Sequence, residues 1–308
     1  MSQISAPLVK QLREQTGAGM MDCKKALIET GSDIEQAIDW LRKKGLSAAA
    51  KKSTRIASEG LVALALEKNL GAVVEVNAET DFVARNTEFQ EFASQTAKVA
   101  LTQGAQVEKL STAPYPGTEH SVADELIDMV GRIGENMVVR RCSVLRVDRG
   151  IVAGYVHNAV TEDAGTIAVL VGLESEGDEE SLKKFGHKLA MHICAARPVS
   201  VDKDSVDLAL IEREKAVLRE QAQGAGKSPD IVEKMVEGRL NKFFKEVSLQ
   251  EQIYVIDGES VVKKVVASFE EKLGTSVKIV SFARFELGEG VERKDDDFAA
   301  EVAAQIKP

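Results

Sequence analysis

The chain has 308 residues, 44% of them hydrophobic and 29% charged, which is the composition of an ordinary globular protein with two or three compact units. Its formal net charge of −9 argues against nucleic acid as the main partner, because phosphate contacts need a concentrated basic face. No apolar run approaches the ~18 residues of a membrane-spanning helix, and the first residues lack a secretory-signal pattern. We therefore expect a cytoplasmic protein with no nucleic-acid or membrane partner.

Residues 1–45 predict three short helices that form a docking bundle. The second helix is expected over 20–29, and Ser32 and Glu35 have the spacing of a capping box for the third. That third helix is expected to end at Gly45, after two lysines that suit the negative end of the helix dipole. A bundle of this size is marginal alone but large enough to bind a partner.

Residues 46–58 contain Lys51, Lys52 and Arg55 among alanines and serines. They could form a small basic patch or a solvated helical linker. No aromatic residues interleave with the basic ones for base stacking, so the pattern favours the linker.

A strand-to-helix corner follows. Residues 71–76 are apolar and β-branched, as in a strand, and Thr87 and Gln90 have capping-box spacing ahead of a helix. Between them Asp81 and Phe82 lie in an acidic turn, and such corners are surface features. Phe82 could point outward at a partner, or it could fold back into its own core while Asp81 caps a turn. The residues alone favour the second interpretation, because isolated apolar residues are common near surfaces and do not by themselves indicate a partner.

The pattern strand–turn–strand–helix occurs twice, which is typical of an internal repeat. It predicts an α+β fold with two related antiparallel-sheet subdomains, the first at 59–148 and the second at 149–202 and 248–290. A helix capped by Ser121 is expected to run to Ile133, and residues 104–120, with two prolines, are expected to form a loop.

Residues 203–247 predict an inserted antiparallel helical hairpin. The apolar stripe of such a hairpin needs a partner, which could be a second copy of the chain, another protein or the core itself. Residues 291–308 predict a C-terminal helical module with Phe298, Val302 and Ile306 on one face. The pattern leaves open whether this helix packs on the core or is offered to a partner.

The sequence offers no catalytic site, metal site or cofactor motif. Cys23, Cys142 and Cys194 form no CxxC pair and predict buried thiols in a reducing compartment. No cysteine lies at ligand spacing from a histidine. Residues 226–228 imitate the end of a phosphate-binding loop, but Gln221 replaces the required glycine and a helix, not a strand, precedes them.

Five blocks resemble bacterial translation elongation factor Ts, in the order of that family. The longest are Glu-Val-Asn-Ala-Glu-Thr-Asp-Phe-Val-Ala-Arg at 75–85 and Leu-Arg-Glu-Gln-Thr-Gly-Ala-Gly-Met-Met-Asp-Cys-Lys-Lys-Ala-Leu at 12–27. The shorter ones are Ile-Gly-Glu-Asn at 133–136, Lys-Met-Val-Glu-Gly-Arg at 234–239 and Phe-Glu-Leu-Gly-Glu-Gly at 285–290. Ala78 departs from the family, where Cys or Ser is common, but it is expected to face the sheet interior.

The resemblance implies a nucleotide-exchange factor for the GTPase elongation factor Tu, with no enzymatic chemistry or cofactor of its own. It implies a UBA-like N-terminal bundle, a wedge that disturbs the Mg²⁺ and phosphate site of the GTPase, and a hairpin that could join two copies. The alternative is a scaffold that binds a protein without altering nucleotide release. The implied wedge residues are Thr80, Asp81, Phe82 and Val83, and the other implied contacts are Leu12, Lys24, Ile133, Gly134 and His157.

Overall fold

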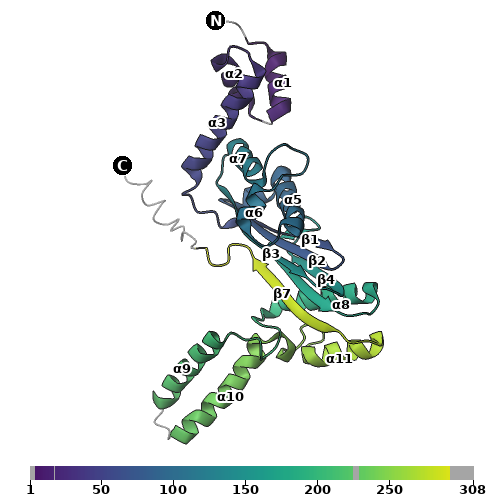
Figure 1. Cartoon of the computed structure of the whole chain (residues 1–308). Coiled ribbons are helices and arrows are strands. Elements are labelled where there is room, and N and C mark those ends of the chain that lie inside the picture. Colours follow the sequence, from purple (N-terminus) through teal and green to yellow (C-terminus); the bar gives the residue numbers. More distant parts are fainter. Residues whose placement is uncertain (1–3, 17, 225–228, 292–308) are drawn as a thin grey trace.

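The computed structural model describes residues 4–16, 18–224 and 229–291 (Figure 1). The predicted C-terminal helix and the segment that imitates a phosphate-binding loop lie outside these residues. The fold is α+β with antiparallel sheets, as expected. None of the helices within the described ranges combines the length and apolar character needed to cross a bilayer.

The N-terminal bundle consists of α1 (Ala6–Thr16), α2 (Met20–Glu29) and α3 (Ile34–Lys52), packed around Leu12, Cys23 and Leu27. Asp33 caps α3 by accepting from the Gln36 N–H, so the capping box expected at Ser32 is wrong. The expected helix end at Gly45 is also wrong.

Instead α3 continues to Lys52, and Gly45 serves a close helix crossing. A Cβ added to Gly131, on α7 (Val122–Ile133), would lie 3.4 Å from the Gly45 Cα. The absence of side chains on these two glycines lets the helices approach closely, and an Arg42–Asp124 ion pair of 3.3 Å lies beside the crossing. The predicted linker therefore begins as helix, which ties the bundle to the core.

The first sheet has the order β3-β2-β1-β5, formed by β1 (Glu59–Glu67), β2 (Leu70–Ala78), β3 (Met137–Arg146) and β5 (Ala164–Gly165). On one face, α5 (Thr87–Gln103) and α7 enclose a core built around Phe89 and Phe92. Asn86, not Thr87, caps α5. The expected loop at 104–120 contains a short helix, α6 (Val107–Thr112), because fully buried Leu110 anchors it to this core.

The second sheet has the order β4-β6-β7, formed by β4 (Gly150–His157), β6 (Ile167–Glu174) and β7 (Lys278–Glu286). Its outer face is covered by α8 (Glu179–Ala196) and α11 (Val262–Leu273), with η1 (Leu249–Glu251) beside them. The order of elements repeats that of the first sheet. The equivalent glycines Gly60 and Gly150, near the starts of β1 and β4, even share a positive φ of 125° and 122°.

The two sheets pack face to face between their helices. Alternate residues of β1 and β2, such as Leu64 and Val73, point away from α5 and meet Val152 and Leu170 of the second sheet. This alternation is the two-residue period of a strand. Deep in the same interface the fully buried Glu75 carboxylate accepts hydrogen bonds from Arg140, Arg141 and the Gly288 N–H.

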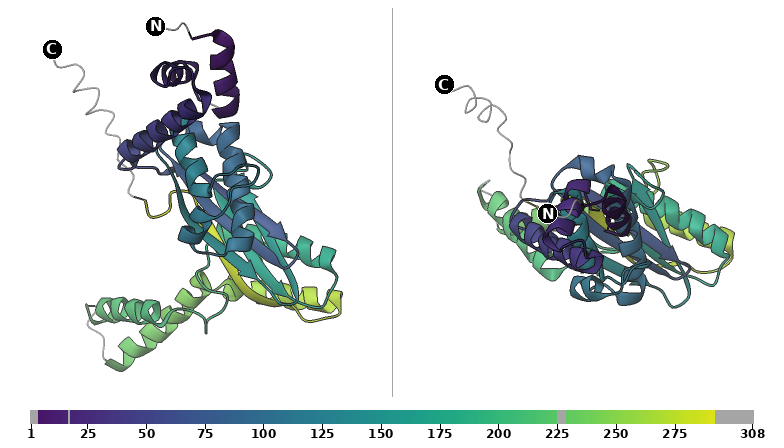
Figure 2. Two further views of the ribbon diagram at one scale, coloured as in Figure 1. Left: turned by 45° about the horizontal axis from the view of Figure 1, so that its top comes forward. Right: turned by 90° about the horizontal axis from the view of Figure 1, so that it is seen from above.

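The hairpin of α9 (Leu208–Gly224) and α10 (Pro229–Val247) projects from the core at the end away from the N-terminal bundle (Figures 1 and 2). Its two helices hold each other through Leu218, Val232 and Val236, and through an Arg219–Glu233 ion pair of 3.0 Å. Its predicted role in self-association stays a prediction.

Candidate partner-binding corner

The corner between β2 and α5 presents a phenylalanine to solvent. It is formed by the four-residue helix α4 (Asp81–Ala84), and the Phe82 side chain on it is 73% exposed. The interpretation in which Phe82 folds back into its own core is therefore wrong. Asp81 is also exposed, and its carboxylate pairs with Arg85 at 3.3 Å.

Val83 and Leu12, both expected to contact the partner, are instead core residues. Val83 is 3% exposed and packs in the core of the first sheet, while Leu12 is fully buried within the N-terminal bundle. For Val83 the reason is helical periodicity, because one turn of α4 cannot direct neighbouring residues to the same side; Leu12 lies on the inner face of α1. Val83 anchors the corner from inside, and Phe82 is left outside.

The corner is fastened to the turn between α7 and β3 and to the segment after α3. The Glu135 carboxylate accepts from the Thr80 N–H at 2.9 Å and from the Thr80 hydroxyl at 2.7 Å. In return the Glu79 carboxylate accepts from the Asn136 N–H and pairs with Arg55 at 3.3 Å. The Asn136 side chain donates to the Arg55 carbonyl. We call these five residues the corner clamp.

The clamp brings two separate sequence blocks together. Ile133 is half-buried against the first core, and Gly134 ends α7 with a φ of 92°, a left-handed conformation that favours glycine. Both precede Glu135 directly, so these two predicted contact residues lie next to the corner that carries Phe82. The role of Ile133 and Gly134 as contact residues stays a prediction, and sequence reasoning missed Glu135 and Arg55 as residues that hold the corner.

The N-terminal bundle presents a second candidate surface on α2. Lys24, a predicted contact residue, is exposed, and so are the apolar side chains of Met20 and Ile28. The three residues are four positions apart in turn and therefore share one face of the helix. Sequence reasoning missed Met20 and Ile28, although this spacing around Lys24 was visible in the sequence.

His157 lies at the exposed end of β4, as the sequence predicted for a strand end. Its Nδ1 is 3.0 Å from the Tyr155 hydroxyl, and the Tyr155 ring meets His187 edge to face. His157 belongs to the second sheet and has no contact with the corner clamp among the hydrogen bonds of the described residues.

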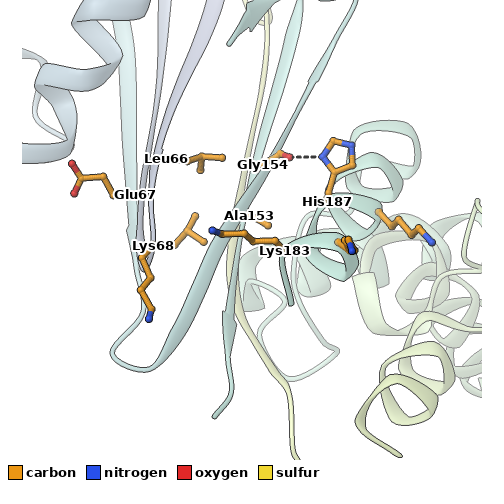
Figure 3. A pocket seen from close by; sticks show the side chains of 10 residues that line it. Leu66, Glu67, Lys68, Ala153, Gly154, Lys183 and His187 are labelled. Carbon is orange, nitrogen blue, oxygen red and sulfur yellow. Dashed lines mark hydrogen bonds between the residues drawn. The ribbon is translucent and has the colours of Figure 1, made fainter. Parts of the chain in front are cut away.

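A groove of about 550 Å³ lies elsewhere, between the β1–β2 turn, β4 and α8 (Figure 3). Its floor includes Val152 and Ala153, and lysines line its sides. Two of these, Lys68 and Lys183, already pair with Glu179, and Lys184 pairs with Glu180. The groove therefore has little excess positive charge with which to bind an anion.

The described residues show little reactive chemistry. They contain no cluster of three or more His, Cys, Asp or Glu side chains able to hold a metal ion. Burial raises the pKa of the Cys23, Cys142 and Cys194 thiols, which keeps them protonated and weakly nucleophilic. What the surface offers instead is a set of exposed apolar and charged contacts.

Comparisons with known proteins identify the family of the chain. The family model described as Elongation factor TS matches residues 79–289. Elongation factor Ts of Rhodospirillum centenum is 55% identical over 304 residues, which cover 99% of each chain. The protein of the same name from Paramagnetospirillum magneticum is 54% identical over 305 residues, 99% of this chain and 98% of that protein. That from Rhodospirillum rubrum is 53% identical over 308 residues, the whole of both chains. The chain therefore belongs to the elongation factor Ts family.

Proposed function

We propose that this protein is a guanine nucleotide-exchange factor that promotes release of GDP from elongation factor Tu during translation. The observation that supports this best is the exposed Phe82, on a corner held by the corner clamp, in a chain that belongs to the elongation factor Ts family. Surface aromatics on a rigid support are typical anchors of protein interfaces. Such a factor is not an enzyme in the chemical sense, because it makes and breaks no covalent bond.

The proposed mechanism is a displacement at the partner's nucleotide site. GTPases hold GDP through a cradle of backbone amides and a magnesium ion. Phe82 would enter an apolar crevice beside that cradle, and the Asp81 carboxylate would disturb the polar network around the magnesium ion. Thr80 supports both through its bonds to Glu135. Because coupling between two ligands is reciprocal, tight nucleotide binding expels the factor in turn.

Other surfaces would hold the two proteins together. The α2 face with Met20, Lys24 and Ile28 would dock on the nucleotide-binding domain of the GTPase, with Leu12 supporting it from inside. Ile133 and Gly134 would add contacts next to Phe82. His157 would contact another domain of the GTPase.

The proposal keeps most of the division of the chain expected from the sequence. The UBA-like docking bundle, expected over 1–45, would extend to the end of α3 at Lys52 and shorten the linker to 53–58; the first core subdomain would comprise 59–148, and the second 149–202 and 248–290. The hairpin at 203–247 would mediate homodimer formation. The partner is a protein, with neither nucleic acid nor membrane involved, and the site of action is the cytoplasm.

The release rate of a fluorescent GDP from elongation factor Tu, with and without this chain, tests the function. We expect faster release with the parent chain and loss of the effect when Asp81 and Phe82 are both replaced by alanine. Binding without faster release would instead establish the alternative, a scaffold that leaves the nucleotide untouched. The chain with Leu66→Ala, an exposed apolar residue at the far end of the β1–β2 hairpin, is the control.

A further inference from the structure

The Glu135 carboxylate is committed to a single residue of the corner. One of its oxygens accepts from the Thr80 N–H at 2.9 Å and the other from the Thr80 hydroxyl at 2.7 Å. Within the described ranges Glu135 forms no ion pair within 4.0 Å of a basic side chain. Hydrogen bonds to a charged acceptor are about twice as strong as neutral ones, so this pair is a firm attachment.

The attachment is needed because α4 is too short to hold itself. Its four residues make a single turn, its N-cap Thr80 makes no side-chain bond to the helix, and Val83 is its one buried residue. A turn of that length is unstable alone. The direction of Phe82 therefore depends on attachments to the rest of the fold: Val83 and Ala84 pack on the first core, the Gln90 side chain donates to the Ala84 carbonyl, and Thr80 binds Glu135 at the start of the turn.

The opposite half of the corner clamp fixes Glu135 itself. Asn136 is 5% exposed, and its N–H and side-chain amide both donate across the gap, to Glu79 and to the Arg55 carbonyl. Glu135 binds Thr80 after β2, and the next residue, Asn136, binds Glu79 of the same segment. The turn that carries Glu135 is therefore fixed by the segment that it holds. Reciprocal bonds of this kind leave neither turn free to move alone.

We infer that Glu135 is the positioning residue of the exposed corner: it acts through Thr80 to hold Phe82 in the orientation that meets a partner, and it does not touch the partner itself. The inference rests on the proposed function in taking Phe82 as the contact residue. A corner ordered before docking avoids the entropy loss of ordering it in the complex. A Glu135 variant should therefore fold normally, lose order at Thr80 and act as a weaker exchange factor.

Amide hydrogen exchange reads the attachment directly, without any partner. In Glu135→Ala the Thr80 amide should exchange about tenfold faster or more, while amides of β2 such as that of Val74 keep their protection. Glu135→Gln retains one acceptor oxygen, so its Thr80 amide should exchange at a rate between those of the parent and of Glu135→Ala. Glu119→Ala, which removes a charge from an exposed glutamate outside the corner clamp, should match the parent. An unchanged Thr80 amide in Glu135→Ala would overturn the inference.

A double-mutant cycle then tests whether Glu135 acts through Phe82. Glu135→Ala alone should slow catalysed GDP release about three- to tenfold, but the loss should be clearly smaller in a Phe82→Ala background, where only Asp81 is left to position. Equal losses in both backgrounds would show that Glu135 contacts the partner independently and would refute the positioning role. If Phe82→Ala promotes GDP release as fast as the parent, the proposed function of the corner fails. The exchange rate of the Thr80 amide in Glu135→Ala still tests whether Glu135 holds the corner.

Discussion

Replacing Phe82 by alanine separates folding from partner binding with unusual clarity, because the side chain is mostly outside the fold. Of about 200 Å² of side-chain surface available for burial, roughly 150 Å² stays in water at 73% exposure. At ~25 cal/mol/Å², the part buried within the fold stabilises the protein by about 1 kcal/mol, and burying the rest in a partner could contribute up to about 4 kcal/mol.

We therefore expect Phe82→Ala to lower the free energy of unfolding by about 1 kcal/mol at most. The loss in exchange should be larger, about 2 kcal/mol or more, which corresponds to about 30-fold slower release at limiting factor concentration. Urea unfolding measures the first quantity and release of fluorescent GDP from elongation factor Tu the second. Leu66→Ala is the matched control, because it also shortens an exposed apolar side chain, but one on β1 of the first sheet, away from the corner.

Two results would refute this reasoning. Exchange by Phe82→Ala at the parent rate would mean that the exposed ring meets no partner. A loss of stability that accounts for the whole loss of exchange would mean that the ring matters only within its own fold. Either result would leave the exposure of Phe82 without a role.

Three further predictions concern the rest of the molecule. Glu75→Ala should lower the free energy of unfolding by about 3–5 kcal/mol in urea titrations, because it leaves two arginines without their buried carboxylate, and Glu75→Asp should recover only part of it. Deleting 205–246 should change the sedimentation coefficient, beyond the change in mass, more than it changes GDP release; the same oligomer with and without the hairpin would contradict this. His192 is fully buried and its Nδ1 accepts from the Val255 N–H, and burial lowers its pKa below 6.5. The unfolded chain then binds the proton more readily, so stability should fall as pH drops below about 6.5. His192→Gln should be less stable but should lose that part of the pH dependence, and an identical slope in both proteins would count against it.

Much of the architecture could be predicted because strands, helices and caps depend on local sequence patterns. Nearly continuous apolar runs produce β1 and β2, whose residues are buried on both faces, and the cap at Ser121 is confirmed because capping involves only residues three positions apart. Ala78 is buried in the first core, as expected for its place in the strand. The two-sheet repeat follows from the same local signals used twice.

Long-range contacts decided what local patterns could not. The sequence predicted a helix end at Gly45, yet a glycine that ends one helix can equally serve a close crossing, and only the approach of α7 selects between the two. Likewise, Phe82 and Val83 are adjacent and both apolar, so the pattern could not say which is buried. The turn of α4 and the packing of Val83 on the first core settle it.

The sequence alone therefore determined the class of fold, the order of its elements, and the corner that carries Asp81 and Phe82. Only the tertiary structure showed that the corner is held by Glu135, which is 55 positions away from Thr80. The physical reason is that helices, strands and caps arise from interactions among near neighbours in sequence. A hydrogen bond between a carboxylate and a distant backbone N–H produces no pattern in the sequence. It can be recognised only in the folded structure, where the two turns lie together.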